Sequence, residues 1–421
     1  MSSEVPSQLI PIRARTTRLP NTFAALEHRN YQLYFGGQLI SVAGTWMQTT
    51  AQLWLVYKLS SSDLMLGIVG FAAAIPALVV SPWGGVIVDR VPKRTLLVIT
   101  QASAMILAFI LAVLTFTNTV QVWHIIVLAA GLGLVNAFDG PARHAFVVEM
   151  VGREDMVNAI ALNSMMFNGA RVIGPWLGGV TYALFGAGWC FLLNGLSFLA
   201  VIAGLLMMTP ASRPSAPLHV SPWKQLTSGL SYVRSHIDLL GLLILALISS
   251  VFALSYAAVL PAFIDQNLHQ GAAEFGNINA AIGLGAVIGA LLIAHNGERS
   301  GRRGIWLQWA SIGFPLALLA FAINGNYQLA LGLGFALGLG FMIQFTLINT
   351  LLQTHVEDQL RGRVLSLYTL TFFGLAPFGN LAIGALAQAW GLAPSISLSA
   401  ALALVFSVIV LAAIPAVKRL P

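Results

Sequence analysis

Two charged side chains, Asp139 and Arg171, are expected deep inside an otherwise apolar sequence. Both belong to the stretch from Gly131 to Gly179, which a polar hinge, VGRED at residues 151–155, divides into two helical runs. Asp139 lies about fourteen residues before the middle of the hinge and Arg171 about eighteen after it, so their depths differ by roughly 6 Å at about 1.5 Å per helical residue. A long arginine side chain covers that difference. The sequence therefore predicts that the two charges could meet.

Three kinds of chemistry are open to this pair. Asp139 could carry a proton, although an adjacent Arg171 would favour the anion. Arg171 could instead bind an anionic or catecholate-like substrate with its fork of donors, or the two could form a permanent salt bridge between helices. Either charge alone in the membrane would cost roughly 3 kcal/mol. Asn136 and Asn168 each precede one of the charges by three positions, so both charges have an amide on the same helix face.

Asp139 is also the acid that a proton-coupled mechanism would use. Asp63 is expected at the outer side, and the remaining acids of the first half at the inner end. The corresponding span of the second half offers Gln344 and Asn349 but no carboxylate.

The composition places these charges in a membrane protein. Hydrophobic residues make up 57% of the 421 residues and charged residues 8%, against roughly a quarter charged in soluble domains. The mean hydropathy is +0.83. Apolar runs of about twenty residues recur, and a chain in lipid satisfies its backbone over such runs by forming helices. The sequence thus predicts an all-α membrane protein.

Twelve apolar runs divide into two sets of six. We expect a cytoplasmic leader over 1–30 that is no signal peptide, because it lacks an apolar core and a cleavage site. A six-helix bundle is expected over 31–208, a Pro- and Ser-rich linker with a short surface helix over 209–238, a second six-helix bundle over 239–415 and a tail over 416–421. The two bundles resemble each other: VGREDMVNAIAL at Val151 aligns with VEDQLRGRVLSL at Val356, as in a duplicated transporter.

The basic residues determine the expected orientation. With the N-terminus inside, nineteen of the twenty-one Lys and Arg lie in the leader, the inner loops, the linker or the tail. Lys58, on the outer side, and Arg171 are the other two. The sequence thus predicts a multi-pass protein of the cell (inner) membrane with both termini in the cytoplasm. This distribution explains the net charge of +7 without a nucleic-acid partner.

Several chemistries find no support in the sequence. Cys190 is the single cysteine, so no internal disulfide or cysteine-built metal site is expected. The eight histidines are scattered along the sequence, whereas a membrane enzyme usually clusters such residues near one face. A receptor would more often carry a sizeable soluble domain, and the sequence shows none. We expect no cofactor and no metal. Because no G-x-x-x-x-G-K-[ST] loop is present, energy would come from a gradient rather than from ATP.

The loop GGVIVDRVPKRT has the form G-x-x-x-D-R-x-x-K-R and resembles the cytoplasmic loop signature of the major facilitator superfamily, with Pro92 in place of the usual Gly. A fainter copy, GERSGRR, follows the second span of the second half. Such loops could form an electrostatic latch that closes the inner side, or serve only as basic anchors. The gate-loop residues are Gly85, Asp89, Arg90, Lys93, Arg94, Glu298, Arg299, Arg302 and Arg303.

The run ARVIGPWLGG resembles the Gly-Pro-x-x-Gly-Gly signature on the fifth helix of antiporters of the same superfamily, where it accompanies export. Proline removes a backbone hydrogen bond and glycines allow close helix approach, which predicts a kinked hinge between the halves. Ordinary small-residue packing is the alternative. The hinge residues are Gly174, Pro175, Gly178 and Gly179.

A polar stripe runs along the first span, where Gln38, Ser41, Thr45, Gln48 and Gln52 recur at spacings of three and four and share one face. In the major facilitator fold the first and fourth helices of each half line a central cavity. The resemblance thus implies a substrate-facing stripe, and hydrogen bonding between helices is the equally weighted alternative.

The first span and the segment GPARHAFVVEMV resemble the twelve-helix branch that includes the enterobactin exporter and the macrolide efflux pumps. This resemblance implies the major facilitator fold, two pseudo-symmetric six-helix bundles that rock about a central site. It also implies a monomer that exports a siderophore or an amphiphilic drug-like molecule, driven by protons. A lysophospholipid or other lipid transporter of the same fold is the alternative.

Overall fold

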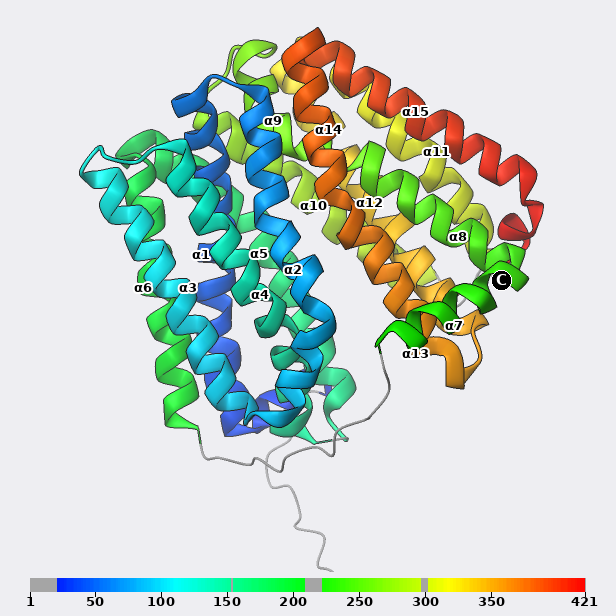
Figure 1. The fold of residues 1–421 in the computed structure, drawn as a ribbon, viewed down its shortest axis with the longest axis horizontal. Helices are drawn as coiled ribbons and strands as arrows, with labels where there is room; N and C mark the ends of the chain where they lie inside the picture. The colour runs from blue at the N-terminus through cyan, green and yellow to red at the C-terminus, as the bar shows by residue number, and fades with distance from the viewer. Residues whose placement is uncertain (1–20, 153, 209–221, 297–301, 421) are drawn as a thin grey trace, which may run out of the picture.

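Helices make up nearly all of the structure, a computed structural model that describes residues 21–152, 154–208, 222–296 and 302–420 (Figure 1). The first half comprises η1 (Asn21–Glu27), α1 (Arg29–Ser60), α2 (Asp63–Arg90), α3 (Lys93–Phe116), α4 (Val122–Val151), α5 (Met156–Phe185) and α6 (Ala187–Met207). The second comprises α7 (Pro222–Ser235), α8 (Ile237–Ile248), η2 (Ser249–Ala253), α9 (Tyr256–Gln266), α10 (Ala272–Asn296), α11 (Arg303–Ala322), α12 (Tyr327–His355), α13 (Asp358–Thr369), η3 (Leu370–Gly374), α14 (Leu375–Trp390), α15 (Leu392–Ala413) and η4 (Pro415–Arg419).

Ten segments within the described residues are long and apolar enough to cross a membrane. They are α2, α3, α4, α6, α8 to α9, α10, α11, α12, α13 to α14, and α15. The long helices α1 and α5 complete the twelve spans. Helix α1 carries the polar stripe and helix α5 carries Arg171. The two helices pack against each other. Their polarity is tolerated because protein surrounds much of it.

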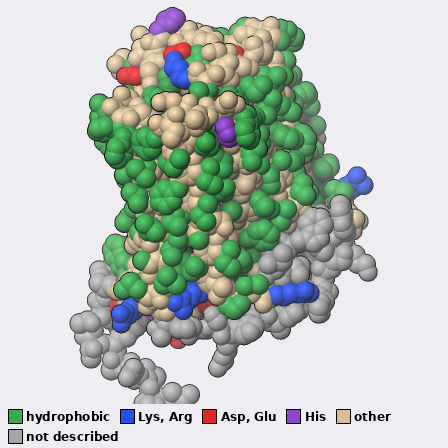
Figure 2. Space-filling view, turned by 60° about the vertical axis from the view of Figure 1, so that its left-hand side comes forward, with side chains coloured by type: hydrophobic (Ala, Val, Ile, Leu, Met, Phe, Trp, Pro, Cys, Tyr) green, Lys and Arg blue, Asp and Glu red, His purple; other side chains and the backbone are tan. Residues whose placement is uncertain are grey.

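The helices form two bundles, α1 to α6 and α8 to α15, which lie side by side in Figure 1. The end that carries the α2–α3 turn, α7 and the start of α11 is called the basic end, since Arg90, Lys93, Arg94, Arg302 and Arg303 lie there. The other is called the opposite end. Hydrophobic side chains cover the middle of the face shown in Figure 2, and Lys and Arg side chains lie toward its ends.

The regions outside the bundles are partly described. Residues 1–20 of the expected leader and 209–221 of the expected linker lie outside the described residues. The rest of the linker forms α7, whose Gly229 packs against the Arg363 carbonyl of α13. At the tail, η4 brings the Leu420 carbonyl to the Gly304 N–H at the start of α11, with an N···O distance of 3.0 Å. This bond satisfies a free donor of the first helical turn.

The second half differs from the first at two spans that were expected as continuous runs. The π-helical turns η2 and η3 interrupt the seventh and eleventh spans, whereas α1 and α5 are continuous. The two turns contact each other, and the Ser250 hydroxyl donates a hydrogen bond to the Phe372 carbonyl. A π-turn shifts the helical hydrogen-bond pattern, so its carbonyls become available to such side chains. Hydrophobic runs contain no signal for this local change.

Glycines bring the two halves into backbone contact. A Cβ placed on Gly179 of α5 would lie 2.8 Å from Gly276 Cα of α10, and one on Gly283 would lie 2.8 Å from the Arg171 carbonyl oxygen. On the other side, a Cβ on Gly67 of α2 would lie 2.6 Å from the Asn380 carbonyl of α14. No side chain fits at these separations. The halves thus meet along α5–α10 and α2–α14.

Polar and aromatic contacts join the halves at the opposite end. Asp265 accepts hydrogen bonds from Lys58 Nζ at 2.9 Å and from the Tyr57 hydroxyl at 2.7 Å. The Ser62 hydroxyl contacts Gln388 Oε1 at 2.8 Å, and Trp54 stacks on Phe275 with ring centroids 5.6 Å apart. Toward the basic end the two bundles diverge (Figure 1).

Candidate functional site

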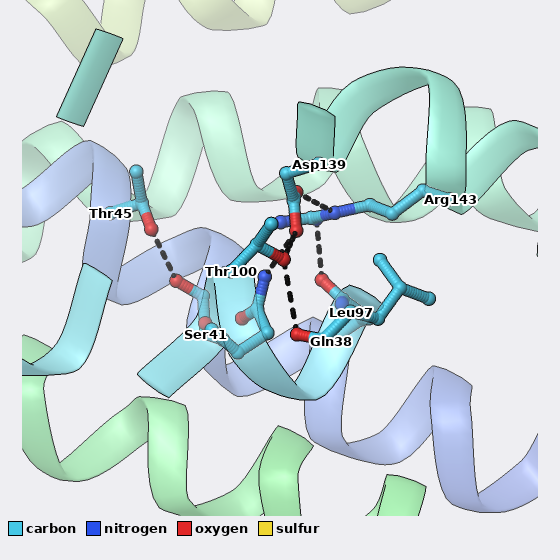
Figure 3. A network of polar contacts seen from close by, with 8 residues as sticks. Gln38, Ser41, Thr45, Leu97, Thr100, Asp139 and Arg143 are labelled. Atoms are coloured by element: carbon cyan, nitrogen blue, oxygen red, sulfur yellow. Dashed lines mark hydrogen bonds and ion pairs between the residues drawn. The ribbon is translucent and has the colours of Figure 1, made fainter. Parts of the chain in front are cut away.

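Asp139 lies in the interior of α4, where its side chain is surrounded by donors. The residue is 3% exposed. Thr100 Oγ1 and Gln101 Nε2 of α3 each donate to Asp139 Oδ1 at 2.7 Å, and Arg143 Nε donates to Oδ2 (Figure 3). Buried carboxylates require such compensation, and removal of one partner from a buried ion pair typically costs about 3–5 kcal/mol.

Arg143 extends this network to α1. Its Nη1 donates to Gln38 Oε1 at 2.6 Å, and its guanidinium carbon lies 5.9 Å from the Phe167 ring centroid of α5. Gln38 is 1% exposed. One network of hydrogen bonds therefore links α1, α3 and α4. We refer to Gln38, Thr100, Gln101, Asp139 and Arg143 as the Asp139 network.

The predicted contact between Asp139 and Arg171 is wrong, because Asp139 pairs with Arg143 instead. Residues four apart on a helix lie on one face, so Arg143 reaches Asp139 without any tertiary arrangement. From the sequence, Arg143 was counted among the basic residues of the inner loops, and its place within the membrane-spanning α4 was missed. The D-x-x-x-R spacing in DGPAR was the available signal.

Arg171 lies at the boundary between the halves. Its guanidinium carbon is 5.7 Å from the ring centroid of Trp46 on α1 and 5.4 Å from that of Phe341 on α12. Within the described residues it makes no hydrogen bond or ion pair, and its side chain is half-buried. Both deep arginines lie near aromatic rings, but of the two only Arg143 also has oxygen acceptors among the described residues.

The polar stripe on α1 is used mainly for contacts between helices. Gln48 Oε1 accepts a hydrogen bond from Asn194 Nδ2 of α6 at 2.7 Å, and Gln38 belongs to the Asp139 network. Thr45 donates to the Ser41 carbonyl on its own helix at 2.9 Å. Gln52 is half-buried. The stripe therefore turns the buried amides of Gln38 and Gln48 toward protein.

The remaining predicted polar residues lie apart from the Asp139 network. Asn136 is exposed, and Asn168 donates to the Ser164 carbonyl at 2.8 Å. Asn349 accepts a hydrogen bond from Gln353.

Gln344 occupies the position in the second half that corresponds to Asp139. The alignment of Val151 with Val356 sets an offset of 205 residues, which also relates these two positions. Gln344 is 2% exposed, and its Nε2 donates to Ser311 Oγ of α11 at 3.1 Å. Its Oε1 is buried without a hydrogen-bond partner among the described residues.

Two of the gate-loop residues, Lys93 and Arg94, bind within their own half. Lys93 Nζ lies 3.0 Å from Glu149 Oε1 of α4, and Arg94 donates to the carbonyls of Leu205 and Leu206 at 2.6 and 2.7 Å. Arg94 thus satisfies free carbonyls at the C-terminus of α6. Arg90 and Arg302 are exposed, and Arg303 begins α11. The burial and contacts of Gly85 and Asp89, and Glu298 and Arg299 entirely, lie outside the described residues.

The hinge motif of α5 packs on two helices. A Cβ on Gly174 would lie 2.4 Å from Trp46 Cβ, and one on Gly178 would lie 2.8 Å from the Met47 carbonyl, both on α1. Gly179 and the Pro175 carbonyl face Gly276 of α10. The motif therefore packs α5 against α1 of its own half and against α10 of the other half.

Metal-ligand chemistry has no site in the described part of the chain, where no group of three or more His, Cys, Asp or Glu side chains could hold an ion. Cys190 is buried and free. The arrangement of twelve spans in two halves, with a charged network inside one half, defines a membrane transporter of the major facilitator type.

The comparison with protein families shows which branch this is. The family model described as "Transmembrane secretion effector" matches residues 20–420, so the chain belongs to that family. The protein is a multi-pass membrane transporter and not an enzyme.

Curated relatives carry the names of exporters and transporters. The staphyloferrin A transporter of Staphylococcus aureus is 26% identical over 87% of this chain and 91% of its own length. The multidrug efflux pump Tap of Mycolicibacterium fortuitum is 27% identical over 84% and 88%. The enterobactin exporter EntS of Shigella flexneri is 28% identical over 68% and 67%.

Solved structures show the same fold. A bacterial homologue of the iron transporter ferroportin, in an inward-facing state, superposes with a TM-score of 0.69 at 16% identity, covering 91% of this chain and 98% of that one. A mutant of the peptide transporter POT superposes with a TM-score of 0.74 at 14% identity, covering 93% and 95%. At these identities the likeness shows the fold alone.

Proposed function

We propose that the protein is a secondary active exporter of a siderophore or an amphiphilic drug-like molecule, coupled to protons and acting as a monomer by alternating access. The relatives named for a siderophore transporter, a siderophore exporter and a drug pump support this substrate class. They give no support to the lipid alternative, which we do not pursue.

The Asp139 network is the observation that carries the coupling proposal. Within the described chain the buried aspartates are Asp63, Asp139 and Asp155, and of these only Asp139 lies in the interior of a helix. Arg143 and the two α3 donors occupy both carboxylate oxygens of Asp139. Proton uptake therefore requires a state in which Arg143 has left the carboxylate.

The hydrogen bond between Arg143 and Gln38 provides a way to move Arg143 off the carboxylate. The amide binds Arg143 from α1, while Asp139 and Arg143 share α4. A shift of α1 against α4 during the transport cycle would draw Arg143 away from Asp139, or leave it with Asp139 alone. In this scheme helix movement changes the proton affinity of Asp139, and the reciprocal effect lets the proton drive that movement.

The basic end is proposed to face the cytoplasm, following the positive-inside rule. The contacts among Lys58, Asp265, Ser62 and Gln388 then close the outer side, and the divergence at the basic end makes this the inward-facing conformation. Asp89 remains proposed as part of a latch that closes the inner side in the outward-facing conformation. Lys93 and Arg94 support it by fixing the α2–α3 loop to their own half.

Proteoliposomes test the exporter directly. The purified chain would be reconstituted and presented with a panel of siderophores and amphiphilic dyes, with a proton gradient first imposed and then collapsed by a protonophore. We expect transport of one class against its gradient, and its loss on collapse. Active transport that continues after collapse would contradict proton coupling, and the absence of transport for the whole panel would contradict the substrate class.

A further inference from the structure

Arg171 has no oxygen acceptor in the described structure, although it lies well inside α5. A guanidinium carries five N–H donors and cannot be neutralised by losing a proton under ordinary conditions. Trp46 and Phe341 lie within cation–π distance of it, which offsets part of the charge but supplies no oxygen to the donors. A cation held in this way at membrane depth is incomplete without an acceptor from water or a ligand.

No carboxylate of the described chain is available to complete it. Asp139, the acid inside the neighbouring α4, is occupied by Arg143, Thr100 and Gln101. The positive charge of Arg171 is therefore available to pair with a ligand that is not part of the chain.

The surroundings of Arg171 indicate what such a molecule looks like. Phe341 begins an aromatic cluster in the second half, with ring centroids 5.8 Å from Phe345 and 6.1 Å from Phe372. Trp46 provides a further ring from the first half. A cation beside several aromatic rings suits a ligand that has an oxyanion on an apolar or aromatic body, since the fork binds oxygen pairs and the rings bind the body.

The site also spans the two halves. Arg171 and Trp46 belong to the first half and Phe341 to the second, and the Arg171 carbonyl packs against Gly283 of α10. A ligand bound here would therefore touch both bundles. Its occupancy would thereby respond to the movement of the halves.

We propose that Arg171, with Trp46 and Phe341, forms the binding site for a carboxylate or other oxyanion carried on an aromatic or apolar body. This inference rests on the proposed export function and makes it more specific, because it selects anionic amphiphiles over neutral and cationic ones.

Calorimetric titration of the detergent-purified full chain tests the site with a matched pair of probes. The ligands 2-naphthoate and 2-naphthamide share one ring system, and only the first is an anion. We expect naphthoate to bind at least about tenfold more tightly, the ratio that one charge-assisted hydrogen bond supplies. Equal affinity of the two probes for the unmodified protein would overturn the proposal without the need for any variant.

Substitutions then locate the preference. In Arg171→Gln, the ratio of the affinity for naphthoate to that for naphthamide should fall close to one. Arg171→Lys should lose most of the preference, because lysine lacks the forked donors of a guanidinium. Phe341→Leu keeps the charge but should weaken naphthoate binding several-fold by removing a ring. Arg234→Gln, which removes one exposed positive charge from α7, is the control and should keep the full ratio. A preference retained in Arg171→Gln, or affinity unchanged in Phe341→Leu, would overturn the site.

The outcome separates this inference from the export proposal. If proteoliposomes export a cationic dye while the chain shows no preference for naphthoate, the exporter stands and the oxyanion site fails. If no compound is transported but the naphthoate preference depends on Arg171, the site stands and the export proposal fails.

Discussion

Corresponding helix pairs of the two halves carry polar groups at matching positions but with different charge. In the first half, Gln101 of α3 donates to Asp139 of α4. In the second half, Gln344 of α12 donates to Ser311 of α11. The first contact belongs to a charged network that includes Arg143, and the second is a neutral pair with one unsatisfied oxygen among the described residues.

This difference suggests a division of work within a duplicated fold. A carboxylate can change its charge by binding a proton, whereas an amide cannot. The second half instead carries a cluster of aromatic rings from Phe341, Phe345 and Phe372, which suits an apolar body. In the proposed function, the first half handles the coupling ion and the second half binds the apolar part of the substrate. Substitutions in each half can test this contrast.

Asp139→Asn should have the largest effect. The amide retains the size and part of the hydrogen bonding of the carboxylate but cannot exchange a proton, so gradient-driven transport in proteoliposomes should fall to the level of protein-free vesicles. Substrate exchange without a gradient and expression in the membrane should remain. Loss of folded protein would instead indicate that Asp139 serves only to join the helices.

Arg143→Leu should destabilise the protein strongly. The substitution leaves Asp139 buried without its cation, a change that typically costs about 3–5 kcal/mol. The thermal unfolding midpoint of the purified protein in detergent would measure the effect. The double variant Asp139→Asn with Arg143→Leu should recover part of the loss, because no uncompensated charge remains. A double variant as unstable as Arg143→Leu would contradict an ion pair.

Asp265→Asn should alter the distribution of conformations. It weakens the contact with Lys58 at the opposite end, and partly exposed ion pairs of this kind contribute about 0.2–1 kcal/mol, or up to roughly fivefold in a population ratio. Maleimide labelling of Ala272→Cys in a Cys190→Ser background would report opening at this end. Unchanged labelling would show that the other contacts at this end, such as Ser62–Gln388 and Trp54–Phe275, hold the halves together without this ion pair.

Gln344→Leu should have the smallest effect. It removes a neutral hydrogen bond together with an amide oxygen that has no described partner, so stability should change by no more than about 1 kcal/mol. Proton-driven transport should persist. A loss of coupling comparable to that of Asp139→Asn would show that the two halves share the proton task, contrary to the division of work between them.

Much of the architecture follows from the sequence. Apolar runs long enough to span a bilayer require helices, and the motifs in GGVIVDRVPKRT and ARVIGPWLGG identify the major facilitator fold. The alignment of VGREDMVNAIAL with VEDQLRGRVLSL also predicted that the span with Gln344 and Asn349 corresponds to the span with Asp139. These features depend on local composition and spacing, which a single chain displays directly.

Only the tertiary structure decided which residues of other helices reach the charges. The pair of Asp139 and Arg143 has a local signal in the DGPAR spacing, but the packing of α1 and α3 against α4 brings Gln38, Thr100 and Gln101 to it. Because Asp139 pairs with Arg143, Arg171 has no oxygen acceptor among the described residues. The packing of α5 between α1 and α10 places Arg171 beside Trp46 and Phe341. Depth in a membrane can be counted along a helix, but which side chain meets which depends on the rotation and contact of helices far apart in the sequence.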